Sequence, residues 1–331
     1  MKHRLIKLTL IVAAAAAVLF SACDILEPEE HGRLVPKTVE EDPSLPSIAV
    51  NGTLLHAETF GDPNNPMIVV LHGGPGGDYR SMLKCAAFAD DGFFVVFYDQ
   101  RGCGLSKRHN RDIYDSRGIS VPVDDLDAVI RHYRAPGQKV VLLGLSWGAM
   151  LATAFIDERP NDIDGAILLE PGGFTWPDTE EYLKRWQTID IFDETVNDRV
   201  FVDQIITGSE HEKLDYKAAI QGAAEYADGN KLGLDGPSPF WRMGAVYAMS
   251  ALDYATEHSF DFTTHLQQFA PTVLFGYSER NEAYGRSHAE LVSSAYPSVQ
   301  LIEVPGTGHN ITYAGWESFY PMALAYLNTV R

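Results

Sequence analysis

The segment that most constrains the fold of this chain is Gly144-Leu145-Ser146-Trp147-Gly148. It follows a short apolar run, residues 139–143, and precedes a stretch of small and apolar residues that ends near Arg159. The run predicts a buried strand, and the stretch after the serine predicts a buried helix. Because glycines flank the serine, strand and helix can approach closely and the serine can adopt a strained backbone conformation. The segment therefore predicts a sharp turn that exposes the hydroxyl of Ser146 between a strand and a helix.

A glycine-rich turn upstream, residues 72–77, has the sequence His-Gly-Gly-Pro-Gly-Gly. It directly follows another apolar run, residues 67–71, which predicts a second buried strand. Backbone N–H groups in such a turn can donate hydrogen bonds to the negative charge that develops on a carbonyl oxygen under attack. We expect the N–H groups of Gly74 and Trp147 to form this oxyanion hole, and His72 to order the turn.

Predicted strands and helices alternate along most of the chain, after a hairpin at 47–58 built on an Asn-Gly turn. Strands are expected at 67–71, 93–98, 139–143, 163–169, 272–275 and 299–304, and helices at 79–89, 123–133 and 314–330. This alternation predicts an α/β fold with a mostly parallel central sheet covered by helices. With the serine turn, it indicates the α/β-hydrolase fold.

Residues 174–268 differ from the rest of the chain, because they are acidic, aromatic and helical in pattern and contain no strong strand run. We expect them to form a helical cap inserted after the sixth strand. The first part of the hydrolase core then covers residues 47–173, and the second part covers residues 269–331.

The N-terminus has the pattern of a bacterial lipoprotein signal. Basic residues precede an apolar stretch, residues 8–20, and small residues then precede Cys23. We expect residues 1–22 to be a signal peptide and Cys23 to be lipidated. The alternatives are an uncleaved anchor or an ordinary signal peptide cut at Ala22.

Residues 23–46 are polar, acidic and proline-bearing, which predicts a flexible tether between the lipid anchor and the catalytic domain. The expected location is the cell envelope, on its periplasmic or extracellular face. Export permits a disulfide between Cys85 and Cys103, but Cys85 lies on a predicted helix and we favour two free buried thiols.

The charge of the chain excludes one class of partner. The formal net charge is −19 and the basic residues are not clustered, so no nucleic acid is expected to bind. The histidines are scattered without the spacing of a metal site, so we expect no metal and no cofactor.

A serine is a poor nucleophile near neutral pH unless a base accepts its proton and a carboxylate orients that base. In the α/β-hydrolase fold the three residues follow one another as serine, acid and histidine. His309 lies in a glycine-rich loop after the last predicted strand and is the expected base. The loop after the preceding strand contains Glu279, three residues past Gly276, which is the expected acid; Glu282 is its rival.

Three motifs taken together resemble the prolyl aminopeptidases (proline iminopeptidases). They are His72-Gly73-Gly74-Pro75-Gly76, Asp99-Gln100-Arg101-Gly102-x-Gly104-x-Ser106 and Gly144-x-Ser146-Trp147-Gly148. The resemblance begins near Ile48 and is strongest over the first half of the hydrolase domain and around His309. It implies that Ser146, Glu279 and His309 form the triad and that Gly74 and Trp147 form the oxyanion hole.

The sequence departs from that family at two places. The family usually has aspartate where Glu279 stands, and it binds the substrate's free α-amine through cap glutamates, one of them in a Trp-x-x-Trp-Glu segment. The nearest aromatic stretch here, residues 240–244, lacks the acid. Candidate partners for an amine are Glu170, Glu225 and Glu282.

These residues predict a serine hydrolase that forms an acyl-enzyme. We favour an aminopeptidase that releases N-terminal proline or another small residue from short peptides. The alternative is a carboxylesterase, lactonase or amidase acting on small apolar acyl substrates, with the aromatic cap as a pocket. A third possibility, from another class, is a non-catalytic lipoprotein that binds a ligand on a hydrolase scaffold.

Overall fold

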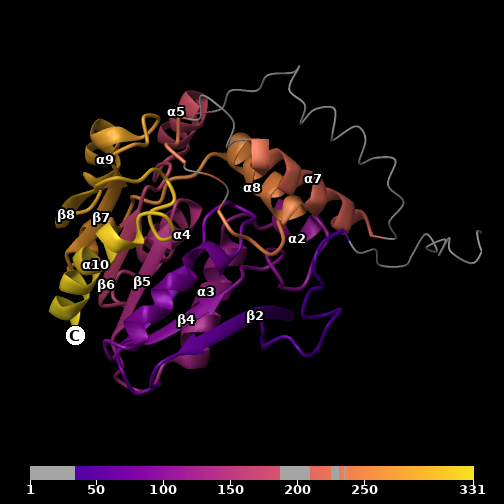
Figure 1. Cartoon of the computed structure of the whole chain (residues 1–331), viewed down its shortest axis with the longest axis horizontal. Coiled ribbons are helices and arrows are strands. Elements are labelled where there is room, and N and C mark those ends of the chain that lie inside the picture. Colours follow the sequence, from indigo (N-terminus) through magenta and orange to yellow (C-terminus); the bar gives the residue numbers. More distant parts are fainter. Residues whose placement is uncertain (1–33, 187–208, 225–230, 235, 237) are drawn as a thin grey trace, which may run out of the picture.

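A computed structural model describes residues 34–186, 209–224, 231–234, 236 and 238–331 of the chain. Within these residues, eight strands form one sheet in the order β1-β2-β4-β3-β5-β6-β7-β8 (Figure 1). The strands are β1 (Ser47–Val50), β2 (Thr53–Phe60), β3 (Met67–Leu71), β4 (Phe94–Tyr98), β5 (Val140–Leu145), β6 (Gly165–Leu169), β7 (Val273–Ser278) and β8 (Val299–Val304). Strands β3 to β8 are parallel, and the β1–β2 hairpin pairs antiparallel to β4. The predicted α/β-hydrolase fold is confirmed.

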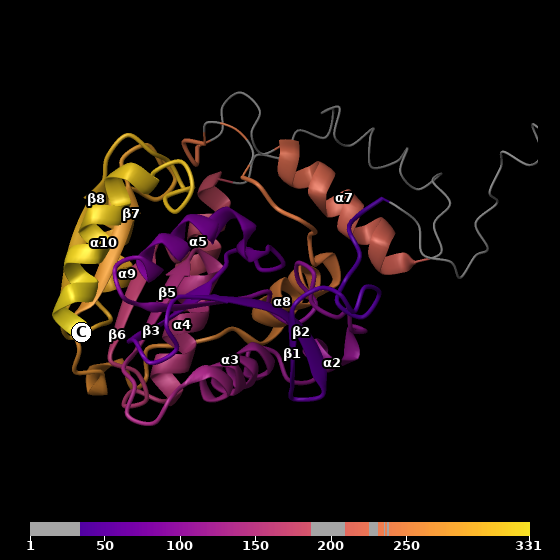
Figure 2. The same cartoon turned by 60° about the horizontal axis from the view of Figure 1, so that its bottom comes forward.

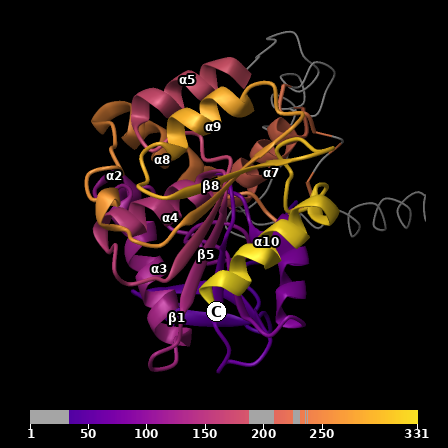
Figure 3. The same cartoon turned by 90° about the vertical axis from the view of Figure 1, so that its left-hand side faces the viewer.

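Helices cover both faces of this sheet, which Figure 3 shows with α10 on one side and α3 and α4 on the other. The helices of the described residues are η1 (Tyr79–Ala89, a 3-10 helix), α2 (Asp112–Asp115), α3 (Ser120–Tyr133), α4 (Trp147–Glu158), α5 (Trp176–Trp186), α7 (Glu210–Ala224), α8 (Ala245–His258), η2 (Leu266–Gln268), α9 (Gly285–Ser293) and α10 (Trp316–Val330). The buried side chains divide accordingly. One cluster lies between the sheet and α3, α4 and α9, and the other lies between the sheet and η1 and α10.

Strand β3 illustrates why the central strands are apolar throughout. All five of its residues are buried, because side chains point alternately to the two helical layers. Met67, Val69 and Leu71 belong to the first cluster, and Ile68 and Val70 belong to the second. A central parallel strand therefore has no solvent face, and its sequence shows no polar alternation.

The helices α5, α7 and α8 follow β6 and precede β7, where the sequence predicted a cap. Helices α7 and α8 pack together on the side of the domain away from α10 (Figures 1 and 2). The start of α8 contacts the loops at the carboxyl ends of the core strands, since the N–H of Gly244 donates to the carbonyl of Gly76 at 2.7 Å.

Buried charges also join the cap to the core. Asp215 of α7 accepts hydrogen bonds from Nε of Arg242 at 2.7 Å and from Nε of Arg108 at 3.0 Å. All three side chains are almost fully buried. Removing Asp215 would take this carboxylate away from two buried guanidinium groups at once, which is strongly destabilising.

The segment before β1 lies against the domain. Val39 is buried and its N–H donates to the carbonyl of Leu105 at 2.8 Å, while the N–H of Leu34 donates to Glu212 of α7 at 2.7 Å. Arg242 donates to the carbonyl of Pro36 at 2.9 Å. The prediction of a flexible tether was therefore wrong for residues 34–46, because buried and hydrogen-bonded groups fix them to the cap and core.

The predicted signal peptide, residues 1–22, and the predicted lipidation site, Cys23, lie outside the described residues. Among the residues that are described, no helix has both the length and the apolar character needed to span a membrane. Cys85 and Cys103 are buried and unpaired, as expected.

Candidate active site

The serine turn has the predicted strained geometry. Ser146 follows β5 and precedes α4, with φ 56° and ψ −122°, a conformation that few residues with side chains adopt. The flanking positions must be glycine because no room exists there for a Cβ atom. A Cβ on Gly144 would lie 2.4 Å from the backbone of Gly148, and a Cβ on Gly148 would lie 2.0 Å from the carbonyl oxygen of Leu71. Strand, turn and helix can thus pack closely only because these two positions lack side chains.

His309 lies in the loop after β8, as predicted, and its partner is Glu170. Its Nδ1 is 2.6 Å from Oε2 of Glu170, which directly follows β6. A carboxylate only accepts hydrogen bonds, so Nδ1 carries the proton and Nε2 remains free to accept one. This is the tautomer that a general base needs.

Glu170 is fully buried and is held by several donors. Its Oε1 accepts from the N–H of Ser278 at 2.7 Å and from the hydroxyl of Ser278 at 2.6 Å. Its Oε2 accepts from Nδ2 of Asn281 at 2.9 Å as well as from His309. Both oxygens are therefore satisfied, and the carboxylate is fixed in the plane that orients the imidazole.

Glu279 does not contact His309, so its predicted role as the orienting acid was wrong. It is exposed, and its Oε2 accepts from the N–H of Gly306 at 2.7 Å. The cause is the length of β7, which continues to Ser278 instead of ending near Phe275. Glu279 consequently lies beyond the end of the strand, beside the turn that follows β8.

The three glutamates predicted as partners for a substrate amine lie in different environments. Glu170 faces His309, so its carboxylate is already occupied. Glu282 is exposed, and Glu225 lies outside the described residues. Sequence reasoning did single out Glu170, but for the wrong role; its position directly after a buried strand and before Pro-Gly-Gly was the signal that could have identified it.

The glycine-rich turn lies directly beside the serine. A Cβ built on Gly73 would be 3.2 Å from Cβ of Ser146 and 3.8 Å from its Oγ. Trp147 is the first residue of α4, a position whose N–H has no acceptor within the helix. Within the described part of the chain, neither this N–H nor that of Gly74 has a hydrogen-bond acceptor. Both are available to a ligand, as an oxyanion hole requires.

Gln100 connects the glycine-rich turn to the serine turn. Its N–H donates to Nε2 of His72 at 3.0 Å, and its side-chain amide donates to the carbonyl of His72 at 3.0 Å. The indole N–H of Trp147 donates to Oε1 of Gln100 at 2.9 Å. His72 in turn donates from Nδ1 to the carbonyl of Gly73 at 2.9 Å, and burial lowers the pKa of His72. His72 is thus a neutral residue that orders the turn, the role predicted for it.

Two buried aspartates, Asp78 and Asp99, accept hydrogen bonds next to the glycine-rich turn. Asp99 accepts from Nδ1 of His56 at 2.8 Å and from the N–H of Tyr79 at 3.1 Å. Asp78 accepts from the N–H groups of Trp241 at 2.5 Å and Arg242 at 3.0 Å, which join the turn to the cap. Burial, together with the nearby Asp99 charge, raises the pKa of Asp78 to about 7.

The described residues contain no group of three or more His, Cys, Asp or Glu side chains placed to hold a metal ion. The arrangement itself combines a hydroxyl on a strained turn, a histidine oriented by a buried carboxylate, and two free backbone N–H donors.

The fold, the serine turn and the His309–Glu170 pair together define a hydrolase of the α/β class. A family model for the alpha/beta hydrolase family matches residues 68–319, more than half of the chain, so the protein belongs to this family.

Comparison with known proteins also confirms the resemblance to proline iminopeptidases. The chain is 35% identical to the proline iminopeptidase of Clostridium botulinum over 107 residues, which are 32% of this chain and 35% of that protein. It is 30% identical to the proline iminopeptidase of Arabidopsis thaliana over 151 residues, 44% of this chain and 38% of that protein. The matched stretch thus spans less than half the length of these relatives.

Solved structures share the fold over more of the chain. The proline iminopeptidase of Mycobacterium smegmatis has a TM-score of 0.58 at 19% identity, covering 86% of this chain and 98% of its own. The enol-lactonase of Burkholderia xenovorans has a TM-score of 0.58 at 18% identity, covering 86% of this chain and 100% of its own. At such identities the likeness shows the fold alone.

Proposed function

We propose that this protein is a serine hydrolase in which Ser146 is the nucleophile, His309 the general base and Glu170 the orienting acid. The observation that supports this most is the geometry around His309. Its Nδ1 is bound to a buried carboxylate, and it lies in the loop that faces the serine turn in this fold. A histidine oriented in this way by a buried carboxylate is what a serine nucleophile requires.

The reaction proceeds in two steps. His309 accepts the proton of Ser146 at Nε2 while Oγ attacks the carbonyl carbon of the substrate. The N–H groups of Gly74 and Trp147 stabilise the oxyanion, and His309 then protonates the leaving group. A water molecule attacks the acyl-enzyme by the same route and releases the acid.

The favoured substrate is a short peptide from which the enzyme releases an N-terminal proline or another small residue. The similarity to proline iminopeptidases from a bacterium and a plant supports this choice. A carboxylesterase, lactonase or amidase is the second candidate. It is favoured by one observation, that the carboxylate of Glu170 is bound to His309 and is therefore not free to bind a substrate amine.

Two measurements test these proposals. A fluorophosphonate probe should label the wild-type protein and fail to label Ser146→Ala; equal labelling of both would exclude Ser146 as the nucleophile. Hydrolysis of Pro-, Ala- and N-acetyl-Pro-naphthylamide should then be compared with that of p-nitrophenyl butyrate. Cleavage of Pro-naphthylamide but not of its acetylated form supports the aminopeptidase, whereas cleavage of the ester alone supports the esterase.

We also propose that Cys23 is lipidated after removal of residues 1–22, and that the lipid holds the enzyme at the cell envelope. The basic, apolar and small-residue pattern before Cys23 supports this. Metabolic labelling with an alkyne fatty acid should mark the wild-type protein and not Cys23→Ala. Equal labelling of the two, or none in either, would contradict the proposal.

A further inference from the structure

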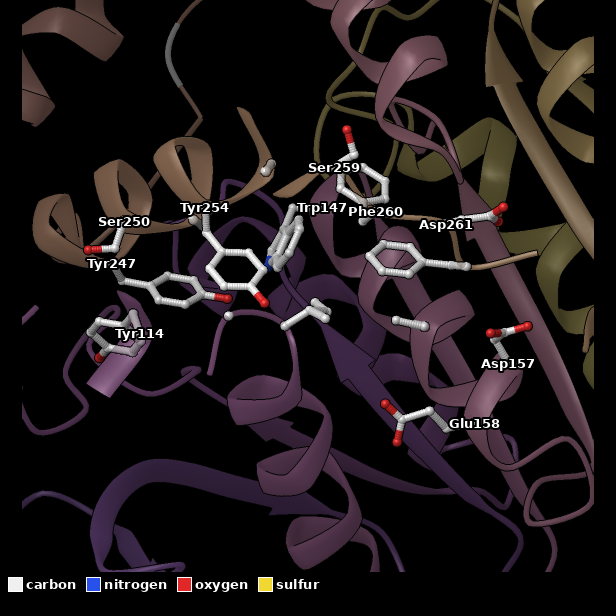
Figure 4. Close-up of a pocket in the computed structure, with 16 residues that line it drawn as sticks. Tyr114, Trp147, Asp157, Glu158, Tyr247, Ser250, Tyr254, Ser259, Phe260 and Asp261 are labelled. Atoms are coloured by element: carbon white, nitrogen blue, oxygen red, sulfur yellow. The ribbon is translucent and has the colours of Figure 1, made fainter. Parts of the chain in front are cut away.

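A cavity of about 260 Å³ lies beside Trp147, between α4, α8 and the segment that leads into α3. It shares Trp147 with the active site, but neither Ser146 nor His309 lines it. In Figure 4, Tyr247 and Tyr254 extend from α8 beside Trp147, and Phe260 lies across from them. The cavity is slightly smaller than the roughly 300–1,000 Å³ of sites that hold drug-sized ligands, so its occupant is a small molecule.

One wall of this cavity contains a buried hydroxyl without a partner. Tyr247 is 3% exposed, and its hydroxyl has no hydrogen-bond partner among the described residues. The hydroxyl of Ser250, one turn further along α8 and fully buried, has none either. Burying a polar group without a partner is costly, so such groups in a native protein usually have a ligand or water. In Figure 4 the Tyr247 ring directs its hydroxyl toward the space beside Tyr254.

The charges around this cavity are of one sign. Its lining includes Asp157, Glu158 and Asp261 but no lysine, arginine or histidine. Basic groups outside the lining lie near two of them. Arg159 lies 3.5 Å from Glu158, and Nδ1 of His265 lies 3.7 Å from Asp157.

The carboxyl groups of Glu158 and Asp261 line the cavity from exposed positions. Burial raises the pKa of Glu158, and Asp124 and Asp157 add to this, although Arg159 acts in the opposite direction. Asp261 accepts from Thr263, through its N–H at 2.8 Å and its hydroxyl at 2.6 Å, and no cation pairs with Asp261 among the described residues. The site therefore favours a positively charged occupant.

We infer that this cavity binds a small organic cation, an aryl- or alkylammonium ion, at a site distinct from the catalytic serine. The aromatic faces of Trp147, Tyr254 and Phe260 attract a cation through their π electrons and also cover its apolar part. The ammonium N–H groups donate to the hydroxyl of Tyr247, and the carboxylates at the edge supply the opposite charge. The inference concerns binding alone and stands whether or not Ser146 is a nucleophile.

The test is calorimetric titration of the full-length protein in detergent with 2-phenylethylammonium chloride at neutral pH. Its uncharged and anionic analogues, 2-phenylethanol and 3-phenylpropanoate, serve as matched probes. We expect one saturable site at which the cation binds about tenfold more tightly than the alcohol, since a desolvated cation–π contact contributes roughly that factor. Equal affinity for cation and alcohol, or no saturable binding, would overturn the inference.

Two variants locate the site. Ala251→Phe fills the cavity from α8 and should abolish binding, whereas Leu252→Phe places the same ring on the exposed face of α8 and should not. Tyr247→Phe removes only the unpartnered hydroxyl. It should weaken binding about five- to tenfold, the effect of one lost hydrogen bond, without lowering the melting temperature. Unchanged affinity in a folded Ala251→Phe protein, or in Tyr247→Phe, would place the ligand elsewhere.

Discussion

Replacing Glu170 with glutamine is the sharpest test of the active site, because glutamine keeps the shape of the side chain and changes its hydrogen bonding. In the wild-type protein Oε2 accepts the proton on Nδ1 of His309 at 2.6 Å. An amide group at that position donates instead, which favours the tautomer with the proton on Nε2. That nitrogen can then no longer accept the proton of Ser146. In a protease triad the equivalent change lowers kcat by about 10⁴-fold.

We therefore expect Glu170→Gln to lower kcat by about 10³- to 10⁴-fold, which corresponds to about 4–5 kcal/mol of transition-state stabilisation. KM should change little, because the substrate does not contact this side chain. The variant should also be less stable. One oxygen of Glu170 faces the N–H of Ser278 and the other faces Asn281 and His309, so an amide NH₂ meets a donor in either orientation.

The assay is steady-state hydrolysis of whichever substrate the wild-type enzyme cleaves, measured well below the melting temperature of each variant. Glu279→Gln is the matched control, because Glu279 is exposed and a glutamine carbonyl still accepts from Gly306. Its kcat should stay within about twofold of wild type, as for most exposed substitutions away from the chemistry. A large loss in Glu279→Gln with little loss in folded Glu170→Gln would refute the assignment.

Three further outcomes are expected. Ser146→Gly and Ser146→Ala should both abolish turnover. The glycine variant should nevertheless have a free energy of unfolding in urea about 1–2 kcal/mol higher than the alanine variant, because φ 56° and ψ −122° strain any residue with a Cβ. Equal stabilities of the two variants would show that the turn is unstrained. Gln100→Ala removes the side-chain hydrogen bonds to His72 and Trp147. Because the oxyanion hole is then displaced, kcat should fall about 10–100-fold with KM nearly unchanged. An unaltered kcat would mean that the glycine-rich turn holds its position without Gln100. Burial raises the pKa of Asp78 to about 7, so between about pH 4 and 7 the folded state holds a proton on this group that the unfolded state does not. Asp78 therefore adds to the free energy of unfolding as the pH falls through this range, whereas buried His72, whose pKa is lowered, subtracts from it. The free energy of unfolding of the wild type minus that of Asp78→Asn should rise as the pH falls, and an identical pH dependence in the two proteins would contradict the assignment.

Much of the fold and part of the site follow from local sequence. The central strands are continuous apolar runs because both of their faces are covered, and the serine turn is recognisable because its glycines are demanded by backbone contacts of 2.0–2.4 Å. His72, Ser146 and His309 lie where the motifs place them. Such features depend on residues close together in sequence.

The acid was assigned to the wrong strand end, because a glycine such as Gly276 is compatible with two structural roles. Its sequence position after an apolar run suggests the end of a strand. In the structure it lies inside β7, where a Cβ would be 2.7 Å from the side chain of Leu169 on the neighbouring strand. This glycine therefore marks close packing between β6 and β7, and only the paired strands show that the loop starts after Ser278. The position of residues 34–46 was missed for a similar reason, since their partners Glu212 and Arg242 are distant in sequence.

The choice of Glu170 changes how this enzyme can diversify. Ser146 and Glu170 follow adjacent strands, and the N–H of Ser146 donates to the carbonyl of Leu169 at 2.8 Å, so the sheet itself sets the spacing of these two residues. Both residues precede the cap in the chain, and the acid does not come from the loop after β7. Insertions and substitutions in the cap can accumulate while the nucleophile and acid keep their register, whereas the loop after β7 must still supply Asn281, which donates to Glu170. Substrate preference and catalytic geometry can thus be selected separately in this chain.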